Sequence, residues 1–194
     1  MDDLEARTQN ELTDVILILT ELTGLPSRWS GRIELVPNAE FKGRKRQMCD
    51  IQIDAALAAQ DERWPILIHE ALHSISAEYR GTDFQTMPGW EEGVVEYLQR
   101  HFCPVIFNRL GIPIALTDFA LREQRHQYNK YIKQLDLLRQ ALDYDEPQFF
   151  LDLLKVSIRE RPGFIFGQGN LLLDQERVRF VRLFSSANSV LKDF

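Results

Sequence analysis

His69-Glu70-Ala71-Leu72-His73, followed after eighteen residues by Glu92-Gly93, is the stretch from which this 194-residue sequence is best interpreted. On a helix, His69 and His73 lie one turn apart on the same face, so both imidazoles can reach one metal ion. Glu70 is rotated by roughly 100° from His69 and can hold a water bound to that ion. Three protein ligands and an open fourth position make a catalytic zinc site. We therefore expect a Zn²⁺ site with His69, His73 and Glu92 as its ligands.

The residues around this stretch favour a buried helix over an accidental match. Two histidines and a glutamate at set positions also occur by chance, and the alternative is a surface helix with two solvated histidines. However, apolar residues continue after His73 at Ile75, Ala77 and Tyr79, which keeps the helix on a core. The segment that carries Glu92 is again amphipathic, which supports the zinc site.

This pattern resembles that of the gluzincin metallopeptidases, whose aminopeptidase-N-like branch has the same spacing between the histidine segment and a Glu-Gly pair. The resemblance covers roughly residues 48 to 98, about a quarter of the chain. It implies that His69, His73 and Glu92 bind zinc and that Glu70 is the general base. It also implies a small zincin-like fold: α+β and mostly helical, with a short N-terminal sheet, a metal-binding helix pair and C-terminal helices.

Another carboxylate lies one helical turn after Glu92. Glu96 shares the face of Glu92 and can accept the free ring N–H of a ligand histidine, as an acidic residue at this offset does in thermolysin-like members. The alternative for Glu96 is a solvent-facing carboxylate. Glu91 is the competing third ligand, but it points elsewhere on the helix. Only Glu92 is followed by a glycine, Gly93, which would let the backbone approach a partner helix closely.

Two other classes of zinc peptidase are tested by the same region. A metzincin needs Gly and His three and six residues after His73, where this chain has Ser76 and Tyr79, so that class is excluded. An aspzincin takes an Asp ligand from a Gly-Thr-x-Asp segment, and Gly81-Thr82-Asp83 has its Asp one place early. Asp83 is the weaker alternative ligand, and we expect it in a turn after the metal helix.

Hydrophobic periodicity predicts a mostly helical chain with a small sheet early in the sequence. The expected strands are Arg32 to Val36 and Met48 to Asp54. The basic run Lys42, Arg44, Lys45 and Arg46 is expected in a solvated loop or hairpin turn. The glycine-rich segment 162–169 is expected to interrupt the helices. The expected helices are Asp2 to Thr23, Asp61 to Tyr79, Pro88 to His101, Val105 to Leu110, Thr117 to Leu142, Asp145 to Arg159, and a last one from Asp174 onward.

Composition fits a single globular enzyme domain over residues 1–194, because 44% of the residues are hydrophobic and 27% are charged. The formal net charge of -6 argues against general nucleic-acid binding. The N-terminus is acidic and its apolar stretch, Val15 to Leu19, is short. We therefore expect no signal peptide, no membrane span and a cytoplasmic protein, although secretion without a cleaved signal is compatible with the sequence. Cys49 and Cys103 fit a reducing compartment, and a single disulfide between them is the open alternative.

The resemblance also implies where a substrate would bind. In gluzincins the strand beside the metal helix is a sheet edge that pairs with the extended substrate, so Met48 to Asp54 is the candidate strand. Its acidic residues would favour basic or neutral peptides. A Tyr or His further along the chain stabilises the oxyanion in that family. Here the candidates are His126, Tyr128 and Tyr131 in a long polar helix, and the tyrosines are favoured because a phenol donates without titrating near neutrality.

These observations predict a zinc-dependent metallopeptidase that acts on a peptide or protein substrate. The related aminopeptidases carry an upstream Gly-x-Met-Glu-Asn segment whose Glu binds the free amine of the substrate. No such segment occurs between Met1 and His69, and Glu40 lacks the flanking residues, so we expect an endopeptidase of narrow specificity. Two alternatives stay open: a zinc-stabilised regulatory or interaction protein with little proteolytic activity, and a hydrolase of a non-peptide bond.

Overall fold

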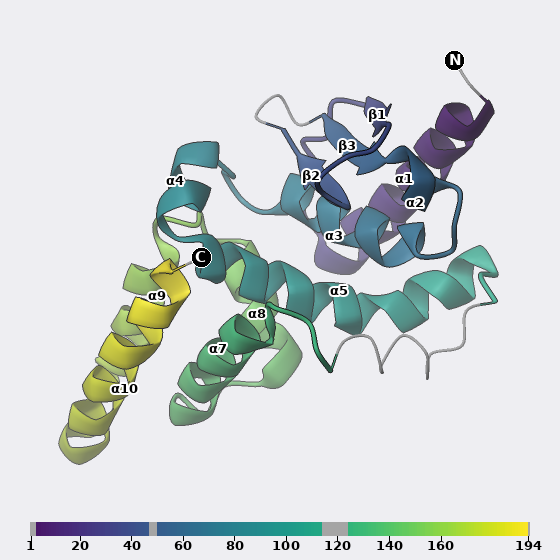
Figure 1. Ribbon diagram of the computed structural model, residues 1–194. Helices are drawn as coiled ribbons and strands as arrows, with labels where there is room; N and C mark the ends of the chain where they lie inside the picture. Colours follow the sequence, from purple (N-terminus) through teal and green to yellow (C-terminus); the bar gives the residue numbers. More distant parts are fainter. Residues whose placement is uncertain (1–2, 47–49, 114–123, 194) are drawn as a thin grey trace. The chain divides into compact units, whose positions relative to one another are not determined.

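The computed structural model describes residues 3–46, 50–113 and 124–193 (Figure 1). It confirms a mostly helical α+β chain with a small three-stranded sheet. The chain divides into two compact units, Met1–Ser76 with Gln99–Asp118, and Ala77–Leu98 with Phe119–Phe194. One domain over residues 1–194 stays a prediction.

The helices and strands of the described residues are, in chain order, α1 Asp3–Thr23, β1 Ile33–Val36, β2 Gly43–Lys45, β3 Ile51–Asp54, α2 Ala55–Ala58, α3 Arg63–Ile75, α4 Gly81–Thr86, α5 Pro88–Leu110, α7 Asn129–Ala141, α8 Glu146–Leu154, α9 Arg161–Gly169 and α10 Asp174–Lys192.

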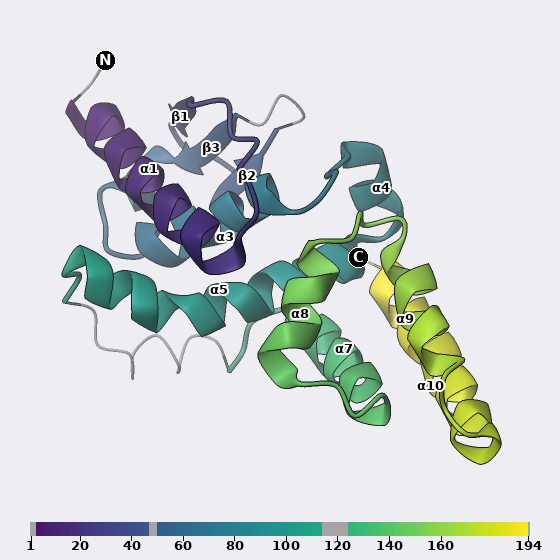
Figure 2. The same ribbon diagram turned by 180° about the vertical axis from the view of Figure 1, so that it is seen from behind.

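In the first unit, the sheet lies next to helices α1 and α3 (Figures 1 and 2). Its strand order is β1-β3-β2, with β1 parallel and β2 antiparallel to the central strand β3. Ile51 and Ile53 of β3 are buried in the core. Arg63, at the start of α3, donates to both carboxylate oxygens of Glu11 in α1, each at 2.7 Å. This two-bond ion pair fixes the first turn of α3 against α1.

Strand β3 is not a sheet edge, which corrects the expectation that Met48 to Asp54 binds the substrate. Gln52 of β3 is paired with Glu34 of β1 on one side and with Arg44 of β2 on the other. Residues 48 and 49, the start of the predicted strand, lie outside the described residues. The edge strand that contacts α3 is β2, from the basic run predicted as a loop. A charged edge strand lacks the apolar alternation by which buried strands are identified.

Helix α3 ends at Ile75, earlier than the predicted Tyr79. The loop after α1 explains this end, because Arg28 bonds to carbonyl groups that a longer helix would use. Its main-chain N–H donates to the carbonyl of Ser74 at 2.9 Å, and its guanidinium donates to the carbonyl of Ser76 at 3.0 Å. A cation at this position also stabilises the C-terminal end of a helix.

Helix α5 continues through Pro104, although the sequence predicts two helices, Pro88 to His101 and Val105 to Leu110. A proline inside a helix removes one main-chain hydrogen bond and costs about 3 kcal/mol. Burying a large apolar side chain contributes about 1.5–3 kcal/mol, so a few buried neighbours offset that cost. The buried residues on either side of the proline are Phe102, Cys103, Ile106 and Phe107.

The second unit contains α7 to α10, and two of these helices are shorter than predicted. Helix α7 begins at Asn129, after turns over residues 124–128, whereas the prediction from Thr117 falls partly on residues 114–123, outside the described part. Helix α8 ends at Leu154 rather than Arg159. The Leu154 carbonyl accepts the N–H of Ala77 at 2.9 Å, and so is not used to continue the helix.

The segment 162–169, predicted to interrupt the helices, forms helix α9. Pro162 lies in the first turn, where no main-chain N–H is needed. Gly169 marks a close contact between α9 and α10, because a Cβ added to it would lie 2.0 Å from Cε1 of Phe180. Figures 1 and 2 both show α9 and α10 side by side. The glycine is therefore used for helix packing and not as a helix breaker.

No helix in the described part of the chain combines the length and the apolar character that crossing a bilayer requires.

Candidate metal centre

Helix α3 carries three of the predicted site residues in its middle. Its inner side is apolar and buried, with Leu67, Ile68, Ala71 and Leu72 all 0% exposed. Packing on that side fixes the rotation of the helix about its axis. As a result, His69 is half-buried, whereas Glu70 and His73 are buried.

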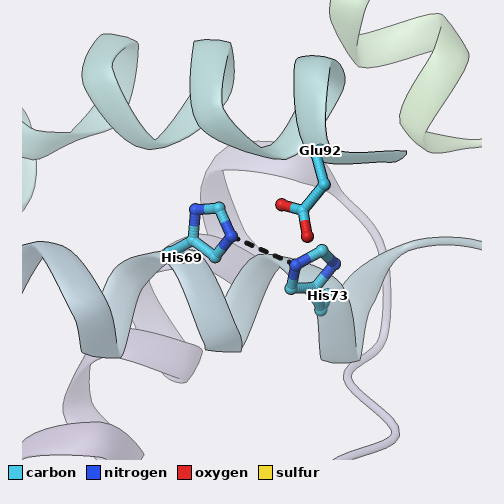
Figure 3. A group of neighbouring side chains, drawn as sticks. All are labelled: His69, His73 and Glu92. Atoms are coloured by element: carbon cyan, nitrogen blue, oxygen red, sulfur yellow. Dashed lines mark hydrogen bonds between the residues drawn. The ribbon is translucent and has the colours of Figure 1, made fainter. Parts of the chain in front are cut away.

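The two histidines are placed to share one metal ion (Figure 3). Their Nε2 atoms lie 3.2 Å apart, and their rings meet at an interplanar angle of 77°. In a tetrahedral zinc site with Zn–N bonds of roughly 2.0–2.1 Å, two ligand nitrogens are separated by roughly 3.3 Å. The observed separation also suits a hydrogen bond between the rings. The distance between the two nitrogens is therefore compatible both with a shared zinc ion and with a hydrogen bond between the rings.

Glu92 of α5 is the third member of the group. One ligand atom each from His69, His73 and Glu92 lies within 4.8 Å of the others, and Figure 3 shows the carboxylate directed toward His73. Glu92 is only 4% exposed. Asp83, the weaker alternative ligand, lies in the short helix α4 and is not in the one such group found among the described residues.

Glu91, the competing ligand, is part of a different interaction. Its carboxylate lies 2.7 Å from the Nη1 atom of Arg161, and both side chains are 0% exposed. Arg161 also donates to the carbonyls of Trp90, at 2.7 Å, and Val156, at 3.1 Å. Burial lowers the pKa of Arg161 from its ordinary value, and the Glu91 carboxylate offsets part of this effect. The structure thus pairs Glu91 with Arg161 and groups Glu92 with the histidines.

Glu96 is buried, so the alternative of a solvent-facing carboxylate is wrong. Its Oε1 atom lies 3.3 Å from Nδ1 of His126, one of the three oxyanion candidates. The sequence did not suggest this contact, because no periodic pattern connects a turn residue with a helix so distant along the chain. That Glu96 orients a ligand imidazole stays a prediction.

Replacing Glu96 by Ala is expected to weaken zinc binding by roughly 10- to 100-fold without unfolding the protein, because residues that orient a ligand imidazole contribute on this scale. Competition with a chromogenic chelator measures the zinc dissociation constant, and circular dichroism monitors the fold. Glu176→Ala, which removes an exposed carboxylate from α10, is the control. A zinc dissociation constant equal to that of the wild type would show that Glu96 does not support the metal ligands.

The three oxyanion candidates do not share one long helix. His126 lies between two turns, Tyr128 lies at the N-terminal boundary of α7, and Tyr131 lies inside α7. The hydroxyl of Tyr131 donates to the main-chain oxygen of Asp193 at 2.6 Å, and its ring is 1% exposed. This contact favours a packing role for Tyr131. Tyr128 and His126 are half-buried, with ring centroids 5.0 Å apart.

Two glycines explain close approaches at the candidate site. A Cβ added to Gly93 would lie 2.7 Å from Cδ1 of Leu135, so this glycine allows a close contact with α7. A Cβ added to Gly43 of β2 would lie 2.5 Å from Cγ2 of Ile66 and 3.1 Å from Oε1 of Glu70. Strand β2 therefore passes directly beside the predicted general base. Gly43 is not among the residues predicted for the site, although an isolated glycine beside strand residues is a sign of close backbone approach.

In comparisons with protein-family models, with curated proteins and with solved structures, nothing matches this chain.

Proposed function

We propose that this chain is a zinc-dependent metallopeptidase with a gluzincin-type centre, in which His69, His73 and Glu92 hold the metal. The observation that carries the proposal is the grouping of these three side chains next to Glu70 on helix α3. The chemistry of the donor set supports zinc, because two imidazoles and one carboxylate leave a fourth position open for water. Catalytic zinc sites with these ligand types hydrolyse peptide bonds.

Each residue then has a defined task. Zinc held at this centre by His69, His73 and Glu92 would supply Lewis-acid polarisation of a water and of the scissile carbonyl. Glu70 accepts the proton of that water and delivers it to the leaving amine, as a base that is not itself a ligand. The developing oxyanion needs a hydrogen-bond donor, for which Tyr128 and His126 are the remaining candidates because the Tyr131 hydroxyl donates to Asp193.

We propose an endopeptidase of narrow specificity rather than an aminopeptidase. The chain before His69 lacks the Gly-x-Met-Glu-Asn segment that would bind a free amine. The sheet edge beside α3 is formed by β2, and an open strand edge can hold a peptide that extends in both directions. This geometry favours cleavage within a chain over removal of its first residue.

Metal analysis of the purified protein tests the proposal. We expect one zinc per chain in the wild type, and loss of both zinc and peptide hydrolysis in His73→Ala, because two remaining ligands hold zinc weakly. The matched control is His101→Ala, which removes an exposed histidine from α5 and is expected to keep the zinc. Elemental analysis and a library of internally quenched peptides provide the two measurements.

Two results would contradict the proposal. A pure wild-type protein that binds no zinc would remove its chemical basis. Stoichiometric zinc with no cleavage of any library peptide would instead favour the zinc-stabilised regulatory protein, because such a protein needs the metal for its fold alone.

A further inference from the structure

Strand β2 has one edge that pairs with no other strand in the described part of the chain. Its bonds to β3 involve even-numbered residues: Lys42 accepts the N–H of Asp54 at 3.0 Å, and Arg46 donates its N–H to Asp50 at 2.8 Å. Alternate residues of a strand direct their main-chain polar groups to opposite sides. The N–H and C=O of Gly43 therefore point to the open edge, where they can pair with an extended peptide.

The side chains along this edge form a row of cations on one face. Lys42, Arg44 and Arg46 are exposed, and residues two apart in a strand share a face. The middle member is held in place, because the guanidinium of Arg44 lies 4.1 Å from the ring centroid of Phe41 and its Nε atom donates to Gln52 at 2.7 Å. This cation row contrasts with the formal net charge of -6 for the whole chain.

We propose that the open edge of β2 binds extended peptides with acidic side chains at alternate positions, and that the cation row determines this specificity. A peptide residue opposite Arg44 has its side chain on the same face, with its Cβ roughly 5 Å from that of Arg44. Residues two places before and after it face Lys42 and Arg46. Opposite charges stabilise such cross-strand pairs, and like charges destabilise them. The sequence-based preference for basic or neutral peptides assumed that β3 is the edge strand. Because β3 is the central strand, that preference is withdrawn.

The position of Gly43 places the bound peptide relative to Glu70, the proposed general base. This step rests on the proposed function. A peptide residue opposite Gly43 points to the face of the sheet where Glu70 lies, because the Oε1 atom of Glu70 is 3.1 Å from the position of a Cβ on Gly43. Its two neighbours point to the cation row. The preferred sequence is therefore acidic-x-acidic, with the residue x beside the general base and the scissile bond adjacent to it.

Binding can be measured with three labelled peptides that are blocked at both ends. They contain the alternating segment Glu-Ala-Glu, the adjacent segment Glu-Glu-Ala, and the basic segment Lys-Ala-Lys, within the same alanine-rich sequence. Fluorescence anisotropy with the Glu70→Gln protein, in which cleavage is disabled, gives the affinities. The alternating acidic peptide is expected to bind about 5-fold more tightly than the adjacent one, because only the alternating peptide places both acids on one face. The basic peptide is expected to bind most weakly.

Charge reversal identifies the residues responsible. Lys42→Glu combined with Arg46→Glu is expected to abolish the preference for the alternating acidic peptide over the basic one, because Arg44 is then the one cation left in the row. Arg44 is left intact because it also bonds Gln52. The matched control combines Arg32→Glu with Arg182→Glu, which changes the net charge equally at exposed positions outside β2 and is expected to keep the wild-type preference.

The outcomes separate this inference from the proposed function. Equal affinity for the alternating and adjacent acidic peptides would overturn strand pairing, and so would tighter binding of an oligonucleotide of equal charge. Cleavage of blocked peptides by the wild type with no acidic preference would overturn the inference and leave the metallopeptidase intact. Selective binding of the alternating peptide without cleavage by the wild type would support the inference and contradict the proposed function.

Discussion

Replacing Glu70 by Gln is expected to lower the rate of peptide hydrolysis by about 10²- to 10⁴-fold, the usual contribution of a general base. Glutamine keeps the size of the side chain beside Gly43, so the contact of α3 with β2 is retained. It cannot accept a proton from water at neutral pH. Because Glu70 is not one of the three proposed ligands, zinc content is expected to stay at the wild-type value.

Measuring the hydrolysis rate and the zinc content of the same sample shows whether Glu70 is a base or a zinc ligand. Initial rates with an internally quenched peptide give the activity, and elemental analysis gives the zinc. Glu78→Gln, at an exposed position just after α3, is the control and is expected to retain activity. Equal turnover by Glu70→Gln and the wild type would exclude Glu70 as the base. Loss of zinc in the same variant would place it among the ligands.

Sequence reasoning found the features that depend on local chemistry. The predicted helix from Asp2 agrees with α1 within one residue, because an apolar stripe defines it and Gly24, with a φ of 69°, ends it. The helical face of Glu92 and the glycine that follows it predict Glu92 rather than Glu91 as the third ligand, and the structure groups Glu92 with the two histidines. Spacing on a helix translates directly into position, so these inferences needed no knowledge of the tertiary fold.

The features that sequence reasoning missed depend on tertiary contacts. Strand β2 reads as a charged loop because its stability comes from pairing with β3 and from the side-chain bond between Arg44 and Gln52. Pro104 predicts a helix end, but the buried residues around it offset its cost. Gly169 predicts a break in the helix, but in the structure it allows the close contact of α9 with the ring of Phe180. In each case a contact with a distant segment outweighs the local propensity.

No local sequence pattern predicts the ion pair between Glu91 and Arg161. We expect the stability of the second unit to depend on this ion pair. A fully buried ion pair need not add stability relative to an apolar pair, but removing one partner leaves the other charge buried and uncompensated. The Nη1 atom of Arg161 donates both to the Glu91 carboxylate and to the carbonyl of Trp90, each at 2.7 Å. These two residues immediately precede Glu92, so Arg161 fixes the turn of α5 that carries the proposed third ligand.

Arg161→Met is therefore expected to lower the free energy of unfolding by about 3–5 kcal/mol, as measured by urea denaturation. The double variant Glu91→Leu with Arg161→Met removes both charges and is expected to recover part of this loss. Recovery is incomplete because the carbonyls of Trp90 and Val156 still lose their donor, at a cost of about 1–3 kcal/mol for each group. If the double variant is as unstable as the single one, the carbonyl bonds and not the buried charge of Glu91 make Arg161 indispensable.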